Sequence, residues 1–162
     1  MCILVNHSDL KINTNYRPDC DTREIYPDDA EDVRKDKKKF PFILNNAVVI
    51  DGIYFDENKE AFHFTFSIKE RYTWDGATIP RLLWFIIGAK GSPEFLIASM
   101  LHDVVCQNKY MLNGNRYLSS LILRETLLSC GTPKWKADVM FFSVDLWQRT
   151  QGWEKYVKVN KQ

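Results

Sequence analysis

Polar residues suited to chemistry gather between residues 72 and 103. The segment 72–81 reads Tyr-Thr-Trp-Asp-Gly-Ala-Thr-Ile-Pro-Arg, and Leu-His-Asp follows at 101–103. A histidine held by one hydrogen bond can act as a base, a proton shuttle or a metal ligand, and an arginine can stabilise a developing anion. The candidate catalytic residues are therefore His102, Asp103 and Asp75, and the candidate binding residues are Thr78, Arg81 and Arg116.

Each residue of the turn also has a structural interpretation. Asp75 can cap the backbone at Gly76, or it can face His102 across a cleft. Thr78 can be the N-cap of a helix that begins near Pro80, or its hydroxyl can line a pocket. Arg81 can bind an anion, or it can pair with Asp75 or Asp103 and lock the turn to the next helix.

Two metal sites are conceivable around His102. His102 and Asp103 are candidate ligands of a divalent metal, as in His-Asp dyads of metal-dependent phosphohydrolases, where His63 and Asp138 or Asp145 would have to complete the set. His102 and Cys106 are four residues apart, a helical spacing that suits zinc. No third and fourth ligand stand at a recognisable spacing, so the sequence leaves metal content open.

The stretch from Tyr72 to about Trp147 resembles a family of small phage and prophage proteins known as domain of unknown function 1353. In that family a turn reading roughly Thr-Asp-Gly-Ala-Ser-Ile-Pro-Arg precedes a helix with His-Asp, then an Arg, then an Asp four residues later. Arg116 matches this pattern, whereas Ser120 stands where the family commonly has Asp. The resemblance implies a fold and a site around these residues, but no activity.

The composition indicates one soluble globular domain. The chain has 162 residues, 45% of them hydrophobic and 14% aromatic, which is enough for a substantial core. A net charge of +1 gives no global attraction to nucleic acid or anionic membrane. No stretch approaches the roughly 20 apolar residues that span a bilayer, so we expect a cytoplasmic protein, in the host cytoplasm if it is phage-encoded. The four scattered cysteines are expected to be free thiols.

The chain is expected to divide into a charged irregular arm at 1–40, a core domain at 41–151 and a tail at 152–162. Two strands are predicted at 47–55 and 61–68, because Phe62, Phe64 and Phe66 alternate with His63 and other polar residues. These strands form a hairpin, with the phenylalanines on the buried face and His63 on the opposite one.

Helices are predicted to follow at about 80–87, 92–108, 116–131 and from 134 onwards, with Ser92, Pro93 and Gly131 as boundary signals. The fold class is therefore α+β: a small antiparallel sheet covered by three to four helices. We expect a set of aromatic residues in the last helix to lie in the core, namely Trp135, Phe141, Phe142 and Trp147. Trp153 and Tyr156 are expected to be exposed.

Two hypotheses about function follow, and they differ in the role of the His-Asp pair. In the first, the protein is a phage or prophage accessory protein that binds a host or virion protein through its charged arm and aromatic tail, and the polar cluster is structural or vestigial. In the second, it is a small hydrolase, aided by a divalent metal or metal-free, that uses His102 with Asp75 and Asp103. Ser120 favours the first hypothesis.

Overall fold

The computed structural model describes residues 2–6, 9–15, 22–24, 26–28, 31–35, 41–74, 93–108 and 115–152. In chain order its elements are β1 (Cys2–Asn6), β2 (Leu10–Thr14), β3 (Thr22–Glu24), α2 (Glu31–Arg34), β4 (Phe42–Leu44), β5 (Val48–Phe55), β6 (Ala61–Ile68), β7 (Thr73–Trp74), α4 (Pro93–Gln107), α5 (Arg116–Ser129), α6 (Lys134–Trp147) and the π-helix η3 (Gln148–Gly152). Antiparallel strands come first and the long helices last, so the predicted α+β class is confirmed.

The larger sheet has four strands in the order β1-β2-β5-β6, and each neighbouring pair is antiparallel. Leu10, Ile12 and Thr14 of β2 are buried and pair with β5. The expectation of an irregular arm is therefore wrong for 2–6 and 10–14. The alternation of Leu10 and Ile12 with polar residues is too short to stand out in sequence, and pairing with β5 makes it a strand.

The hairpin of β5 and β6 forms where the sequence predicts it, with Ile50 opposite Phe66 and Gly52 opposite Phe64. Phe64 and Phe66 are buried whereas His63 is exposed, as expected. The turn is held by Asp56, whose Oδ1 accepts hydrogen bonds from the backbone N–H groups of Asn58 (2.8 Å) and Glu60 (2.9 Å). Lys59 follows with a φ of 63°, a left-handed conformation that completes the turn.

A smaller sheet, in the order β3-β4-β7, carries the chain towards the candidate turn. β7 ends at Trp74, the residue before Asp75, and pairs with Phe42 of β4. The Trp74 ring is buried against Phe42, with ring centroids 5.8 Å apart. This packing anchors the N-terminal end of the segment that contains the candidate turn residues.

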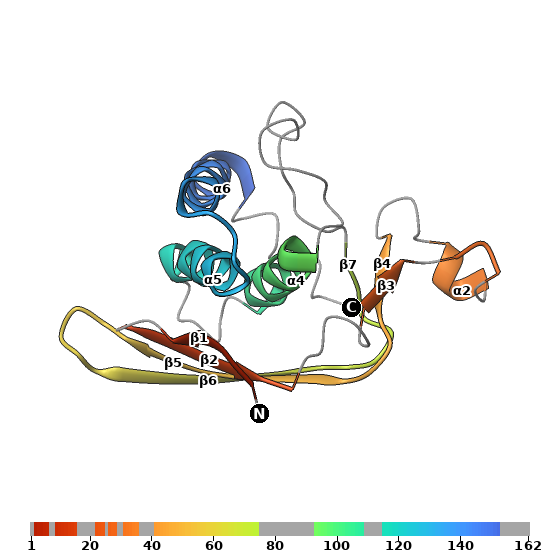
Figure 1. The fold of residues 1–162 in the computed structure, drawn as a ribbon, viewed down its shortest axis with the longest axis horizontal. Helices are drawn as coiled ribbons and strands as arrows, with labels where there is room; N and C mark the ends of the chain where they lie inside the picture. The colour runs from red at the N-terminus through yellow and green to blue at the C-terminus, as the bar shows by residue number, and fades with distance from the viewer. Residues whose placement is uncertain are drawn as a thin grey trace.

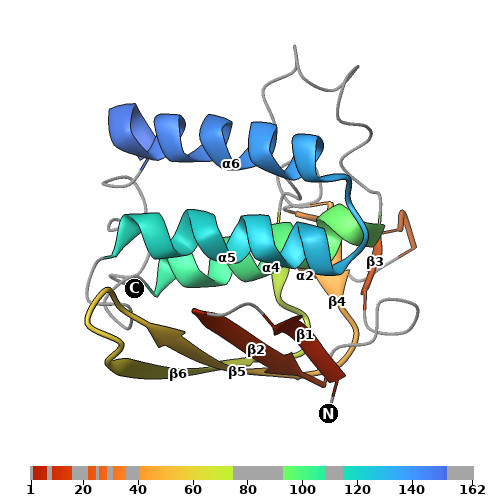
Figure 2. The same ribbon diagram turned by 60° about the vertical axis from the view of Figure 1, so that its left-hand side comes forward.

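The helices α4, α5 and α6 lie on one face of the four-stranded sheet in two layers (Figures 1 and 2). α4 and α5 pack directly on the sheet, and their contact surface is the main hydrophobic core, with residues such as Ile50, Phe66 and Leu101. α6 lies on the far side of this layer, where Ala137 and Met140 pack against Phe95, Leu123 and Leu127 in a second core. α6 is thus the outermost element of the stack.

The ends of α5 follow the predicted signals. Asn115 caps its first turn, because its Oδ1 accepts a hydrogen bond from the Leu118 N–H at 3.0 Å. At the other end Gly131 has a φ of 85°, and the N–H groups of Gly131 and Thr132 donate to the carbonyl oxygens of Leu128 and Leu127. This is a Schellman motif, which satisfies the last carbonyls of the helix and turns the chain into α6.

The aromatic residues of α6 are mostly not in the core, and the corresponding expectation is wrong. The exposed fractions are 52% for Trp135, 67% for Phe142, 62% for Leu146 and 44% for Trp147. The apolar residues of this helix fall on more than one side, and the side with the small residue Ala137 is the one that packs on α5. Close approach to α5 favours small side chains, so the bulky ones lie on the outer side.

Gly52 is required by the close approach of the Phe64 ring. A Cβ atom added at residue 52 would lie 1.9 Å from Cζ of Phe64, so the ring would have to move within a packed core. We expect Gly52→Ala to lower the free energy of unfolding by about 1–3 kcal/mol. Urea unfolding measures this loss.

The matched control is Val49→Ala at an exposed position of the same strand, which should change the free energy of unfolding by no more than about 0.5 kcal/mol. Combining Gly52→Ala with Phe64→Leu should recover part of the loss, since the smaller side chain makes room for the new methyl group. A Gly52→Ala variant as stable as the wild type would contradict the proposed packing.

Candidate functional site

A buried cluster of polar side chains surrounds His102, between α4, α5 and the end of α6. His102 and Cys106 occupy successive turns of α4, with Cys106 Sγ 3.5 Å from His102 Nε2. The same cluster contains Ser119 and Ser120 of α5, and Gln148, the first residue of η3. All of these residues are buried, and Cys106 has an exposed fraction of 0%.

Gln148 holds the cluster together. Its amide nitrogen lies 3.0 Å from His102 Nε2, 3.2 Å from Cys106 Sγ and 3.1 Å from Ser119 Oγ. Its amide oxygen accepts a hydrogen bond from Ser120 Oγ at 2.9 Å. One side chain therefore connects α4 and α5 to the end of α6. The π-helical turn begins at this residue, and such turns are frequent where a side chain has a specific task.

Asp103 lies within ion-pair distance of its sequence neighbour. Its Oδ1 is 3.7 Å from His102 Nδ1, and both side chains are largely buried. Neighbouring residues on a helix project about 100° apart, so the sequence did not favour this contact. It gives the imidazole a carboxylate at one ring nitrogen and the Cys106–Gln148 pair at the other.

The pKa of His102 is raised from 6.5 to about 10. Burial by itself disfavours the charged ring and lowers the pKa, but electrostatic attraction to Cys106 and hydrogen bonding to Asp103 and Cys106 outweigh it. At neutral pH the ring therefore carries protons on both nitrogens. One of these N–H groups faces Asp103, and the other needs an acceptor on the Gln148 side.

The Gln148 amide can provide that acceptor. A half-turn about its terminal bond exchanges the positions of the amide oxygen and nitrogen, which have nearly the same size and shape. The oxygen then faces His102 Nε2–H, and the amide nitrogen donates to the Ser119 and Ser120 hydroxyls, which can both accept. Ser119 Oγ already donates to the Arg116 carbonyl at 2.7 Å. The protonation state of His102 and the orientation of Gln148 are thus coupled.

Arg116 does not join the His102 cluster. Its guanidinium forms a short ion pair with the buried Asp145 carboxylate and also donates to the Asp145 carbonyl oxygen at 3.2 Å. The second carboxylate oxygen of Asp145 accepts from Arg149 Nε at 2.8 Å. These contacts tie the start of α5 to the end of α6, beside the link through Gln148.

The structure does not bring His63 and Asp138, two candidate metal ligands, to the His102 cluster. His63 lies exposed on β6, and Asp138 pairs with Arg124 and Lys134, so these residues do not complete a phosphohydrolase ligand set. Among the described side chains there is no group of three or more His, Cys, Asp and Glu residues placed to hold a metal ion. The predicted roles of three further candidates lie outside the described residues, namely Asp75, Thr78 and Arg81.

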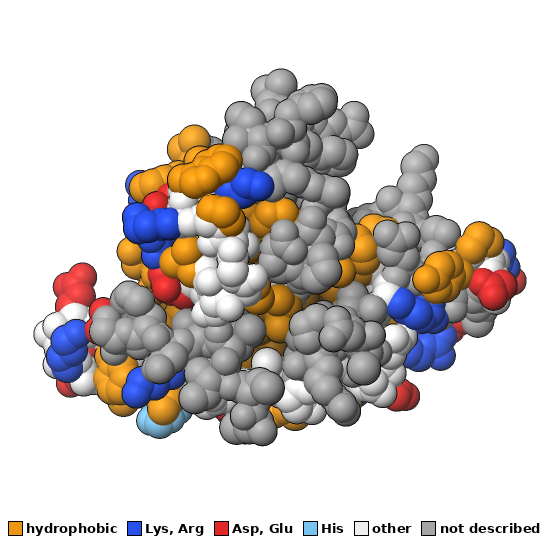
Figure 3. Space-filling model, viewed as in Figure 1, with side chains coloured by type: hydrophobic (Ala, Val, Ile, Leu, Met, Phe, Trp, Pro, Cys, Tyr) orange, Lys and Arg blue, Asp and Glu red, His pale blue; other side chains and the backbone are white. Residues whose placement is uncertain are grey.

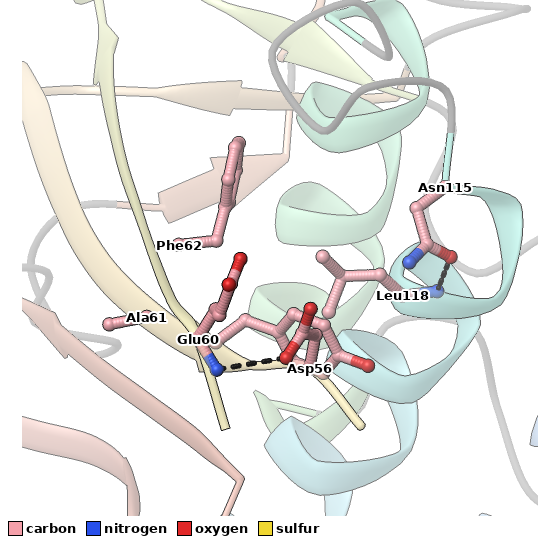
Figure 4. Close-up of a pocket in the computed structure, with 7 residues that line it drawn as sticks. Asp56, Glu60, Ala61, Phe62, Asn115 and Leu118 are labelled. Atoms are coloured by element: carbon pink, nitrogen blue, oxygen red, sulfur yellow. Dashed lines mark hydrogen bonds between the residues drawn. The ribbon is translucent and has the colours of Figure 1, made fainter. Parts of the chain in front are cut away.

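A separate polar pocket lies between the β5–β6 turn and the start of α5 (Figure 4). It has a volume of about 360 Å³, and its walls include Asp56, Glu60, Phe62, Asn115 and Leu118. The Asp56 carboxylate is occupied in holding the turn, and the Asn115 amide oxygen caps α5. These two polar side chains therefore serve local structure.

Burial decides what the His102 cluster can do. A nucleophilic or general-base mechanism needs a group that a substrate can approach to about 3 Å, and the candidate residues His102 and Asp103 are largely buried, with exposed fractions of 7% and 9%. Each polar group instead has a partner within the cluster. The arrangement is that of a buried polar lock between helices, with an imidazole held near a thiol and a carboxylate.

Two residues of the lock were missed by sequence reasoning. Gln148 lies 46 positions after His102, and Ser119 precedes the noted Ser120. A glutamine at the end of an amphipathic helix carries no local signal, because its typical place is the surface. Only the stacking of α6 on α5 brings it to His102.

Comparison with known proteins gives a family and a distant relative. The model of a family described as "Protein of unknown function (DUF1353)" matches residues 47–144. An "Uncharacterized protein y4jT" from Sinorhizobium fredii (strain NBRC 101917 / NGR234) is 34% identical over 74 residues, which is 43% of this chain and 20% of the relative. The alignment thus spans about a fifth of the length of that relative. No solved structure matches the chain.

No helix among the described residues is both long and apolar enough to cross a membrane.

Removing His102 should destabilise the protein. In His102→Ala the buried groups of Gln148 and Asp103 lose a partner, and we expect a loss of about 1–3 kcal/mol in the free energy of unfolding. The matched control is His63→Ala, which removes an exposed histidine and should change it by no more than about 0.5 kcal/mol. Chemical denaturation measures both, and a double-mutant cycle with Gln148→Ala should show coupling. Equal, near-zero effects would contradict the lock.

The raised pKa of His102 predicts a pH dependence of stability. Because the folded-state pKa of about 10 lies above the ordinary 6.5, the stabilisation is complete below pH 6.5 and is lost as the pH rises through 10. Cys106→Ala removes the largest cause that raises this pKa, so the pKa of His102 should fall in that variant. Histidine ring-proton shifts followed by NMR against pH measure it, with His102→Gln to assign the signal. A wild-type value at or below 6.5 would contradict the charged arrangement.

Proposed function

Since the chain belongs to the DUF1353 family, whose function is unknown, we propose from its geometry that it acts by binding another protein. The binding surface is the outer face of α6, defined here by Trp135, Val139, Phe142 and Leu146 and flanked by Trp147. Val139 is half-buried and also packs at the edge of the second core. Three of the four residues that define it are more than half exposed. This observation carries the proposal, because large exposed apolar surfaces on a folded domain are typical of interaction sites.

The arrangement of the fold supports this assignment. α6 is stacked on α5 through Ala137 and Met140, and of the four residues that define its outer face only Val139 reaches the second core. In the space-filling view, hydrophobic side chains gather over α6 with basic side chains beside them (Figure 3). Aromatic residues with an arginine nearby are the composition enriched at energetically important interface positions.

The buried lock gives the same surface its rigidity. Gln148 and Asp145 fix the C-terminal end of α6 to α4 and α5. A preformed face loses less conformational entropy on association than a flexible one, so the lock contributes to affinity without touching the partner. The His102 cluster is thus structural in this proposal, as the sequence hypothesis of a binding protein requires.

The setting of this activity is the phage or prophage accessory role that the family resemblance implies, with a host or virion protein as the partner. The relative from Sinorhizobium fredii supports a modular role, since the similar segment makes up only 20% of that protein. A small binding module can be joined to other domains or used alone.

Phe142→Glu should abolish partner binding without unfolding the protein. A charge at an exposed position changes the stability by no more than about 0.5 kcal/mol, whereas a carboxylate in an apolar interface is desolvated without a partner. We expect wild-type protein, cross-linked in its native host and analysed by mass spectrometry, to yield one stoichiometric protein partner cross-linked through α6, and Phe142→Glu to lose it.

Tyr26→Ala is the matched control, because Tyr26 is about as exposed as Trp135 (54% and 52%) and lies far away in the chain. It should retain the partner. The proposal would be contradicted if the wild type, Phe142→Glu and Tyr26→Ala all retained the partner equally, or if the cross-links lay outside α6.

A further inference from the structure

The outer face of α6 is continued by a groove that can take an apolar side chain. The groove has a volume of about 630 Å³ and is lined by Tyr117, Phe141, Phe142, Asp145, Leu146 and Arg149. Phe141 holds its walls through edge-to-face contacts with Tyr117 and Phe142, with ring centroids 5.7 Å and 5.3 Å apart. Because the groove has an apolar wall and a charged end, it favours a partner whose apolar side chain lies next to a charged one.

The spacing of the apolar residues selects the backbone of the partner. Trp135, Val139, Phe142 and Leu146 follow one another at intervals of three and four residues along a straight helix of 14 residues. Such a helix is about 21 Å long. An α-helix with its own stripe at three- and four-residue intervals packs along this surface as ridges into grooves.

The charges around the face select the side chains of the partner. Lys134 and Lys136 lie at one end of the stripe and Arg149 at the other, and the side chains of Lys134 and Arg149 are largely exposed. Two carboxylates of α6 each pair with two cations, Asp138 with Lys134 and Arg124, and Asp145 with Arg149 and Arg116. With Lys136 added at the N-terminal end, basic groups outnumber acidic ones at both ends of the stripe. The solvent side of α6 is therefore positive at both ends.

We propose that the partner presents an amphipathic α-helix with an apolar stripe and carboxylates at both ends of that stripe. This inference rests on the proposed function of α6 and names the chemistry of its partner. One apolar side chain of the partner occupies the groove beside Phe142, a carboxylate lies near Arg149, and another lies near Lys134 and Lys136.

A second copy of this chain fits the face poorly. If two α6 helices pack antiparallel, Lys134 and Lys136 of one copy lie beside Arg149 of the other, and if they pack parallel each basic end meets its own copy. Both arrangements place like charges together at both ends, which opposes association. Carboxylates of a partner at these two ends favour association instead, and they increase the association rate through electrostatic steering.

The test uses two fluorescein-labelled helical peptides of about 18 residues, long enough to cover α6. Both carry the same apolar stripe of Leu and Phe, and one has Glu where the other has Lys at the two ends. Fluorescence anisotropy at low salt is expected to show the full-length protein binding the Glu peptide at least tenfold more tightly than the Lys peptide. High salt should narrow this difference, since it screens exposed charges.

Protein variants test the contributions of the apolar face and of the basic residues separately. Phe142→Glu should abolish binding of the Glu peptide, whereas the double variant with Lys134→Glu and Lys136→Glu should remove most of the tenfold preference, because only one end of the stripe is then basic. Arg149→Gln should weaken Glu-peptide binding several-fold. His63→Glu, an exposed change on the sheet, is the control for net charge and should have little effect on the tenfold ratio.

Several results would overturn the inference. If both peptides bind equally and Phe142→Glu abolishes both, the α6 face binds helices and the proposed function stands, but the acidic partner is wrong. Self-association that is lost in Phe142→Glu assigns the face to a second copy instead. Binding to vesicles of anionic phospholipid that is lost in the same variant assigns it to a membrane surface. If neither peptide binds and native cross-linking finds no partner through α6, the proposed function fails as well.

Discussion

The Gln148 side chain is the contact on which the arrangement of the helices depends. Its amide is buried between α4 and α5, and a buried amide without hydrogen bonds costs several kilocalories per mole in free energy. Only one placement of α6 brings this amide to His102, Cys106 and the two serines together. The apolar contact of Ala137 and Met140 favours stacking in general, and the polar cluster selects one register of it.

This constraint separates the two sides of α6. The inner side is fixed by Ala137 and Met140 and by the ion pairs of Asp145, and bulky apolar residues on the outer side are exposed to solvent. A helix in a two-layer stack normally keeps polar residues outside. In the proposed function, this departure connects the His102 cluster to binding, because the histidine is part of the frame that presents the apolar face.

The family motif gains a physical interpretation from these contacts. His102 and Asp103 lie together on α4, whereas Arg116 pairs with Asp145 on the neighbouring edge of the helix stack. The Ser120 hydroxyl lies 2.9 Å from the Gln148 amide, so an uncharged hydroxyl is matched to an uncharged partner. A carboxylate at residue 120 would lie in the same buried cluster as Asp103 and Cys106. It would therefore change the pKa of the His102 imidazole.

The sequence by itself determined the α+β class, the β5–β6 hairpin with His63 outside, and the boundaries of α4 and α5, because these follow from local periodicity and capping residues. It also singled out His102 and Asp103. The strands β1 and β2, the partner of Arg116, the role of Gln148 and the exposure of Trp135 and Phe142 were decided only in three dimensions. Each depends on which surfaces meet across long sequence separations, and a helix with apolar residues on several sides does not reveal which side another helix will cover.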